Sequence, residues 1–203
     1  MGRLHREQKP KWRSLMKEGL HRAVAEVLAE RGLAGLTVER VAKAAGIGKG
    51  TLYLYFADKQ ELLRSVARST LEPLEEELER IAHSKLPPPE KLEAIIRRSL
   101  SYFEEHRHFF RVFLDPEFSG PRMDAAARER HSRLAKKVGR VLEAGIKAGD
   151  FRPLASRKAA EIFIMACAAA IRVRLGAAKP GPLEEDAQMV KEIFFHGVMK
   201  SGS

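Results

Sequence analysis

Four polar side chains between residues 49 and 55 are the groups of this chain best suited to binding a polyanion. Lys49 carries an ammonium group, and Thr51, Tyr53 and Tyr55 carry hydroxyl groups. Such groups hydrogen-bond to the phosphate oxygens and base edges of nucleic acids. An ordinary surface helix rarely places two tyrosines beside a lysine and a threonine. We therefore predict that this stretch contacts DNA, with a plain surface helix as the alternative.

Two short helices joined by a glycine-containing turn would present these side chains. Thr37 is a good N-cap for the first helix, and Glu39 places negative charge near its positive end. Gly46 stands where a left-handed residue would end that helix, and a second helix can begin near Gly48. The apolar positions of the first helix share one face: Val38, Val41, Ala42 and Ala45. This order predicts a helix-turn-helix.

The second helix separates inward from outward residues. Leu52 and Phe56 are four residues apart, which places both on one face of a helix, and we expect that face to be buried. The lysine, threonine and tyrosines named above are then left largely on the outer surface.

Composition indicates a folded protein with a polyanionic partner. The chain has 203 residues, of which 44% are hydrophobic and 32% charged, and this balance is typical of a globular protein. The net charge of +10 favours a polyanion without identifying it. Lys9, Lys11 and Arg13 precede the first apolar helix positions, where they would either bind phosphate or form a solubilising tail.

Cysteine usage and hydropathy point to the cytoplasm. Cys167 is the single cysteine, so neither an intrachain disulfide nor a cysteine metal cluster is possible. The longest apolar run, residues 162–171, is about half of the ~20 residues that a membrane span needs, and no signal-peptide pattern opens the chain. Asn is absent and Gln occurs three times, which suits a thermophile or a GC-rich genome.

Helical spacing recurs almost throughout and period-2 alternation is missing, so we predict an all-α chain of about nine helices. Glycines and prolines mark the helix limits, and Asp58 with Glu61 forms a start like a capping box. The expected helices cover about residues 10–31, 37–45, 48–56, 58–84, 89–105, 107–114, 123–148, 156–175 and 182–198.

The last two helices carry the most apolar surface. Residues 156–175 contain IFIMACAAAI, which is apolar nearly all round and should be covered on more than one side. The last helix has one apolar stripe: Leu183, Ala187, Val190, Phe194 and Val198. A dimer interface and an intrachain core explain this stripe equally well.

Residues 20–63 resemble the TetR family of transcriptional regulators, most strongly in TVERVAKAAGIGKGTLYLYFADKQELL. The third helix of that family carries Thr-Leu-Tyr and a Tyr/His-Phe pair, and a lysine opens its fourth helix. Here these positions are Thr51, Leu52, Tyr53, Tyr55, Phe56 and Lys59. A weaker similarity is GIKAGDFRP at residues 145–153, at the end of the seventh helix.

The resemblance implies an N-terminal three-helix DNA-binding domain, residues 1–58, and a C-terminal helical effector-binding and dimerisation domain, residues 59–203. It implies a repressor that binds a palindromic operator as a homodimer through its last two helices. A small hydrophobic or acyl-type effector among helices four to eight would favour a dimer whose recognition helices are wrongly spaced for DNA. A ligand-blind architectural DNA-binding protein is the alternative.

The resemblance also implies individual roles on DNA. Thr37 and Lys59 would bind backbone phosphate, and Tyr53 and Tyr55 would fix the register. The groups that approach base edges or phosphate in the major groove would be Lys49, Gly50 and Thr51.

An effector pocket is harder to place. The candidate apolar lining is Phe103, Phe109, Phe110, Phe113, Met123 and Met165, although aromatic and methionine residues at helical spacing also form plain core. A basic run could meet an anionic head group such as that of an acyl-CoA, or could be a solvated face: Arg97, Arg98, Arg107, His108 and Arg111.

Enzymatic chemistry has little support. GIGKGT lacks the Gly-Lys-Ser/Thr order of a phosphate loop, and no strand precedes it. His106 and His108 are two residues apart, which places them on different faces of a helix, and no metal-ligand spacing is completed nearby. We therefore predict no catalytic residue, no metal site and no cofactor.

Overall fold

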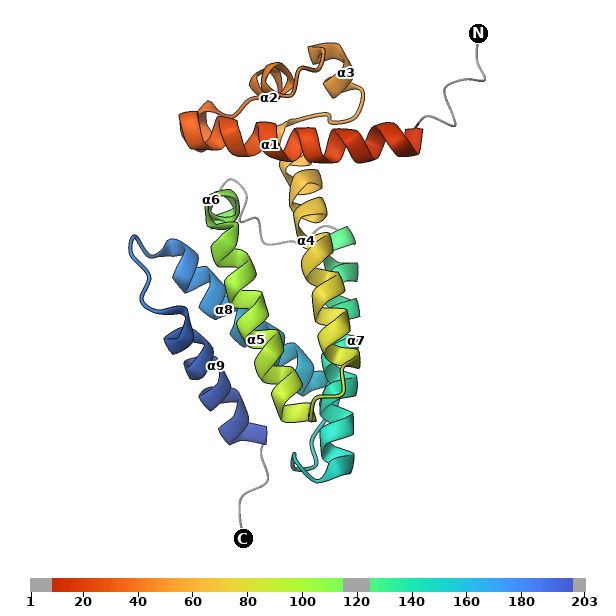
Figure 1. Ribbon diagram of the computed structural model, residues 1–203, viewed down its shortest axis with the longest axis vertical. Coiled ribbons are helices and arrows are strands. Elements are labelled where there is room, and N and C mark those ends of the chain that lie inside the picture. The colour runs from red at the N-terminus through yellow and green to blue at the C-terminus, as the bar shows by residue number, and fades with distance from the viewer. Residues whose placement is uncertain (1–8, 115–124, 199–203) are drawn as a thin grey trace. The chain divides into compact units, whose positions relative to one another are not determined.

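The structure is a computed structural model that describes residues 9–114 and 125–198, and for residues 9–18 and Ala126 it describes the backbone alone. These residues form nine α-helices and one 3-10 turn, and no strand occurs among them (Figure 1). The predicted all-α fold, with an N-terminal helix-turn-helix followed by a helical domain, is confirmed. Met123 lies outside the described residues.

The helix bounds follow the predicted punctuation closely. The elements are α1 Lys9–Gly35, α2 Val38–Ala44, α3 Lys49–Tyr53, α4 Lys59–His83, α5 Pro88–Glu105, α6 Arg107–Phe110, η1 Arg111–Leu114, α7 Ala125–Ala148, α8 Ser156–Gly176 and α9 Leu183–Val198. The predicted helix of residues 107–114 is instead the short helix α6 followed by the 3-10 turn η1, and two helix bounds also differ from the prediction. Helix α1 is broken at Gly32, with φ 62°, and helical turns continue beyond the break to Gly35. Helix α3 ends at Tyr53, so Phe56 lies beyond it and is half-buried.

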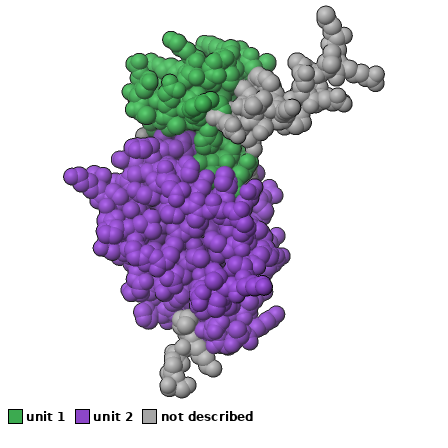
Figure 2. Space-filling model, in the orientation of Figure 1, with its two compact units in different colours: residues 1–72 green, residues 73–203 purple. Residues whose placement is uncertain are grey.

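The chain forms two compact units, residues 1–72 and 73–203 (Figure 2). The division falls inside α4, next to Pro73, whereas a boundary before that helix, at residue 58, was expected. The first part of α4 belongs with the N-terminal helices because Leu62, Leu63 and Val66 are buried in unit 1.

Unit 1 contains α1, α2, α3 and the first part of α4. Its core is built from one face of each helix: Leu20, Val24, Val27, Val38, Val41, Leu52, Leu62 and Leu63. The Thr37 Oγ1 accepts from the Arg40 amide at 3.2 Å, as expected of an N-cap. Gly46 takes the expected left-handed conformation, with φ 67°.

The start of α4 is also fixed by side chains. The Glu61 amide donates to Asp58 Oδ1 at 2.7 Å, and Glu61 Oε2 accepts from the Ala57 amide at 2.8 Å. The reciprocal bond therefore reaches one residue earlier than in an ideal capping box. This cap fixes the residue at which the chain leaves the helix-turn-helix and enters α4.

Unit 2 is a bundle in which α5 contacts α7, α8 and α9, and α8 packs between α7 and α9 (Figure 1). The largest buried side chains at its centre include Leu92, Leu142 and Phe163. Ion pairs attach the second part of α4 to α5 and α7: Glu77 with Arg98, Glu75 with Arg133, and Glu79 with Lys137.

The GIKAGDFRP segment ends α7 with a tight turn. Gly149 has φ 84°, which favours glycine, and the Asp150 and Phe151 amides donate to the Gly145 carbonyl at 2.9 and 3.3 Å. The buried Phe151 ring folds back over Gly145, where a side chain would clash with it. The glycines of this segment are thus explained by the turn and by ring packing.

Candidate nucleic-acid interface

Helix α3 is held by one buried apolar side chain and exposes polar side chains to solvent. Leu52 is fully buried, while Lys49, Gly50, Tyr53 and Tyr55 are exposed. Because α3 has only five residues, one buried side chain and the turn before it fix its orientation in the unit. Four of the predicted DNA-contacting residues are therefore accessible to a partner.

Glu39 of α2 joins two of these side chains. The Lys49 Nζ lies 2.8 Å from Glu39 Oε1, and the Tyr53 hydroxyl donates to the same oxygen at 3.0 Å. The ammonium group also lies 5.7 Å from the centroid of the Tyr53 ring. Lys49, Tyr53 and Glu39, here called the Glu39 cluster, thus form one connected group on the surface of unit 1.

The Glu39 cluster is ionic at neutral pH. The hydrogen bond from Lys49 is the largest cause that lowers the pKa of the Glu39 carboxyl to about 2. The same bond raises the pKa of the Lys49 ammonium group, and the bond to Glu39 raises the pKa of the Tyr53 hydroxyl. The largest cause of each pKa shift is therefore a hydrogen bond within the cluster, because such a bond stabilises the charged carboxylate and makes the donor's proton harder to remove.

The other predicted contact residues have different surroundings. Thr37 caps α2, Thr51 is half-buried in α3, and Lys59 opens α4 and is also half-buried. A Cβ added at Gly50 would meet no atom within 4 Å, so the exposed backbone there is open to a close partner. The assigned DNA contacts of these residues stay predictions.

Two features of this surface were not predicted from the sequence. Glu39 was interpreted only as a helix-end charge, because its pairing with Lys49 and Tyr53 depends on the packing of α2 against α3. Leu54 is 83% exposed, an apolar side chain between the two tyrosines. Leu54 lies outside α3 because the helix ends at Tyr53, and the residue pattern did not indicate that early end.

The aromatic residues proposed as a pocket lining pack against one another. Ring centroids are 4.4 Å apart for Phe103 and Phe110, 5.1 Å for Phe109 and Phe110, and 5.6 Å for Phe109 and Phe113. Phe109 and Phe110 are buried. These rings form an aromatic cluster at the α5–α6 junction. That an effector binds among them stays a prediction.

Met165 does not line an interior pocket. Its side chain is 58% exposed on α8, because that helix buries Phe163, Ile164 and Cys167 instead. A cleft of about 170 Å³ does lie in unit 2, where the end of α4 meets α5 and α7, and none of the six predicted pocket residues lines it. Its lining is Ala82, His83, Pro88, Lys91, Lys137, Arg140, Val141 and Ala144.

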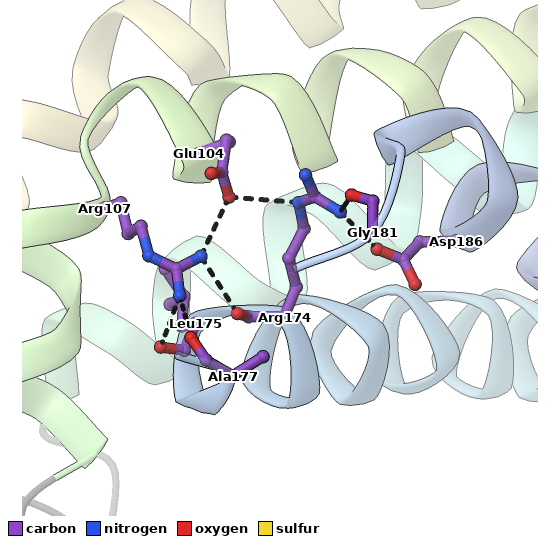
Figure 3. A network of polar contacts seen from close by, with 7 residues as sticks. All are labelled: Glu104, Arg107, Arg174, Leu175, Ala177, Gly181 and Asp186. Carbon is purple, nitrogen blue, oxygen red and sulfur yellow. Dashed lines mark hydrogen bonds and ion pairs between the residues drawn. The ribbon is translucent and has the colours of Figure 1, made fainter. Parts of the chain in front are cut away.

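The predicted basic run is largely engaged in helix packing. Arg98 pairs with Glu77 and Glu105, and Arg97 pairs with Glu93 at 2.9 Å. Arg107 donates to the carbonyls of Arg174, Leu175 and Ala177 at the end of α8 (Figure 3). A solvated face is therefore the wrong interpretation for Arg107, which satisfies carbonyls that the helix leaves unpaired.

A second arginine completes this network. The Arg174 side chain, only 7% exposed, donates to Glu104 Oε2 at 3.0 Å, Asp186 Oδ2 at 2.6 Å and the Gly181 carbonyl at 3.0 Å (Figure 3). Glu104 also pairs with Arg107 at 3.2 Å. The network therefore fastens the α8–α9 connection to α5, a role that the sequence did not indicate.

The predicted dimer stripe of α9 belongs to the chain's own core. Ala187, Val190, Phe194 and Val198 are buried, and Leu183 is half-buried. The Phe194 ring packs on Phe163 with centroids 5.0 Å apart. Helix α9 packs on α5 and α8, so the burial of four of these residues favours the intrachain-core alternative, and a role of the stripe in a dimer interface stays a prediction.

Other faces of the same two helices expose large apolar side chains. They are Ile162, Met165 and Val173 on α8, and Met189 and Ile193 on α9. The positions of α8 recur at helical spacing, and the two of α9 are four residues apart, so each helix has an apolar stripe on its surface. These two stripes are called the outer α8–α9 face below.

Three further observations concern other site types. Cys167 is buried, and burial raises the pKa of its thiol to about 12, so the thiol is protonated and inert at neutral pH. Within the described ranges, no three His, Cys, Asp or Glu residues gather as ligands for a metal ion. No helix in that part of the chain is long and apolar enough to cross a bilayer.

Family models match both parts of the chain. The model described as "Bacterial regulatory proteins, tetR family" matches residues 20–66, and that described as "Tetracyclin repressor-like, C-terminal domain" matches residues 85–172. The HTH-type transcriptional repressor KstR2 of Mycolicibacterium smegmatis is 30% identical over 141 residues, 68% of each chain. The chain belongs to the TetR family. The similarity to that family is confirmed, and its members here are transcriptional regulators rather than enzymes.

Two further proteins are similar to this chain, one in sequence and structure and the other in structure. KstR2 of Mycobacterium tuberculosis is 33% identical over 132 residues, which cover 64% of this chain and 66% of that relative. The solved structure of the ketosteroid transcriptional regulator KstR2 from that organism has a TM-score of 0.61 at 27% identity, covering 91% of this chain and 95% of the other. The Bacillus subtilis regulator FadR, solved with stearoyl-CoA, has a TM-score of 0.74 at 23% identity, covering 89% and 98%, and it supports the fold alone.

Proposed function

We propose that the chain is a ligand-responsive transcriptional repressor of the cytoplasm that binds a palindromic DNA operator as a homodimer. The observation that carries this proposal is the exposed polar surface of α3, held by the buried Leu52 inside a unit that matches the TetR DNA-binding model. Phosphate contacts would set the register, and the side chains of α3 would contact base edges in the major groove.

The proposed DNA contacts are those predicted from the sequence. Lys49, Tyr53 and Tyr55 are exposed for this purpose, and Gly50 leaves room for a close approach of the backbone to DNA. Thr37 and Lys59 stand at the N-terminal ends of α2 and α4, where helix amides and the macrodipole favour a phosphate. Thr51 completes the set from the half-buried side of α3.

The homodimer is proposed to form through the outer α8–α9 face. Exposed apolar stripes on two neighbouring helices are unusual on a monomer and typical of an interface. An isologous interface would place two copies around a two-fold axis, which matches a palindromic operator.

The effector is proposed to be a small hydrophobic or acyl-type molecule that binds in unit 2. One relative supports this class by description, because KstR2 is described as a ketosteroid regulator, and FadR of Bacillus subtilis, solved with stearoyl-CoA, shares the fold. The aromatic cluster of α5 and α6 is the candidate for apolar contact. Helix α4, which begins at Lys59 and continues past Pro73, would transmit the change.

Selection of bound genomic fragments by the purified protein tests the proposal. We expect recovery of a palindrome that binds one dimer and is released by a fatty acyl-CoA or a steroid. Recovery of fragments without a common sequence, or binding that no member of a fatty acyl and steroid panel alters, would favour the ligand-blind architectural alternative.

The selected duplex also separates contact types. Thr51→Ala, if it removes a base contact, should relax sequence preference by ~1–3 kcal/mol, whereas Lys59→Ala should weaken binding to all duplexes and flatten the salt dependence. Titrations of both variants at several salt concentrations would measure this. Equal losses on every duplex for both variants would contradict the role given to Thr51.

A further inference from the structure

A carboxylate stands among the groups proposed to contact DNA. Glu39 is 44% exposed, and its Oε1 receives bonds from both Lys49 and Tyr53. An exposed negative charge disfavours phosphate, and the affinity of proteins for DNA in general depends on neutralising phosphates. Glu39 therefore lowers the general attraction of this surface for DNA, and its position needs another explanation.

The contacts of Glu39 restrict what its two partners can do. A lysine ammonium group has three hydrogens and no acceptor, so Lys49 uses one of them on Glu39 and keeps two for a partner. The Tyr53 hydroxyl has one hydrogen, which is given to Glu39, so its oxygen is left as an acceptor. Glu39 thus sets both the position and the hydrogen-bonding polarity of these groups.

We propose that Glu39 is a specificity-determining positioning residue of the DNA-reading surface, acting through Lys49 and Tyr53. This inference rests on the proposed DNA-binding function. Lys49, held in place, presents hydrogens suited to the O6 and N7 acceptors of guanine, and Tyr53 presents an acceptor suited to the amino groups of adenine or cytosine. The negative charge of Glu39 beside Lys49 repels a phosphate more than a neutral base edge, so phosphate contact alone gains less from this lysine than from an unpaired one.

The test uses the full chain and two duplexes of equal length: one recovered by genomic selection and one with the same bases scrambled. For Glu39→Gln, the scrambled duplex should bind more tightly, and its plot of log affinity against log salt should steepen by about 0.9, as expected for one added phosphate contact. The ratio of affinities for the selected and scrambled duplexes should fall about five-fold or more.

Glu30→Gln is the matched control, because Glu30 is an exposed carboxylate of α1 in the same unit. It removes the same charge and should leave the affinity ratio unchanged. If Glu39→Gln and Glu30→Gln change the ratio equally, Glu39 acts only through net charge and the proposal is overturned.

A second comparison tests the route of action. With Lys49→Gln and Tyr53→Phe both present, adding Glu39→Gln should no longer lower the affinity ratio, since the groups that it positions are gone. A ratio that still falls five-fold would show that Glu39 does not act through them. Failure of the unmodified chain to prefer any selected duplex is a different result, and it would overturn the proposed function together with this inference.

Discussion

At the scale of single residues, Gly145 in the last turns of α7 has no room for a side chain, because the chain after the helix folds back over it. A Cβ at this position would lie 2.2 Å from Phe151 Cδ2 and 3.1 Å from Pro88 Cβ. The Phe151 ring is buried and has little space to move. We therefore expect Gly145→Ala to lower the free energy of unfolding by about 1–3 kcal/mol, as overpacking does in a filled core. Urea unfolding of the purified variant would measure it.

Gly139 supplies the control in the same helix. A Cβ there would meet no atom within 4 Å. Gly139→Ala should therefore leave the stability unchanged or raise it by roughly 0.5–1 kcal/mol, because alanine favours a helix interior over glycine. If both variants lost the same stability, the contact between Gly145 and Phe151 would not be the cause.

At the scale of elements, the Arg174 network fixes the connection between α8 and α9. Its guanidinium group is almost fully buried and holds Glu104, Asp186 and the Gly181 carbonyl (Figure 3). Arg174→Met would remove the arginine donor from Asp186 and the Gly181 carbonyl and one of the two arginine donors of Glu104, and hydrogen bonds that involve charged groups contribute about 1.5–3 kcal/mol. We expect this loss in urea unfolding, together with faster hydrogen exchange in residues 177–183.

Arg172→Met is the matched control for that prediction. Arg172 is exposed on the same helix, and a surface substitution of this kind changes stability by no more than about 0.5 kcal/mol. Similar losses for Arg172→Met and Arg174→Met would mean that the network adds nothing beyond the general effect of removing a guanidinium group from α8.

Elements were predicted best where local residues decide the conformation. The N-cap at Thr37, the left-handed Gly46 and the end of α7 at Gly149 follow from side chains and glycines within one turn. Helix α3 was predicted too long, because Tyr55 and Phe56 fit a helical pattern but the chain turns after Tyr53. Residue spacing shows which side chains share one face of a helix, but the packing of the helix determines the residue at which it ends.

The site was predicted less completely for the same reason. Lys49 and Tyr53 were identified by residue type, whereas Glu39 required the contact between α2 and α3. The stripe of α9 that contains Val190 and Phe194 was correctly identified as apolar, but spacing alone did not say which neighbour covers it. Arg174, which follows the apolar run of residues 162–171 in α8, gave no signal of its partners on α5 and α9.

At the scale of the whole molecule, the position of the core of unit 2 decides which surface is left for a second copy. Val190 and Phe194 are buried in the chain's own core, so the large apolar residues that α9 leaves exposed to a partner are Met189 and Ile193. Ile193 is 70% exposed and forms an exposed apolar stripe with Met189, and contiguous exposed apolar surface is what marks an interaction site. Association through the outer α8–α9 face would remove this apolar surface from water.

Ile193→Glu should therefore convert the proposed dimer into a folded monomer. An unpaired charge buried in an apolar interface costs about 3–5 kcal/mol, which weakens dimerisation by at least about two orders of magnitude. Sedimentation velocity over a range of protein concentrations would measure this, and the monomer should bind a full palindrome no better than two separate half-sites.

Gln188→Glu adds the same charge to an exposed polar position of α9 and should keep the dimer intact. A dimer that persists in Ile193→Glu, with an unchanged thermal midpoint, would place the two-fold contact on another surface and would separate the exposed apolar stripes from operator binding.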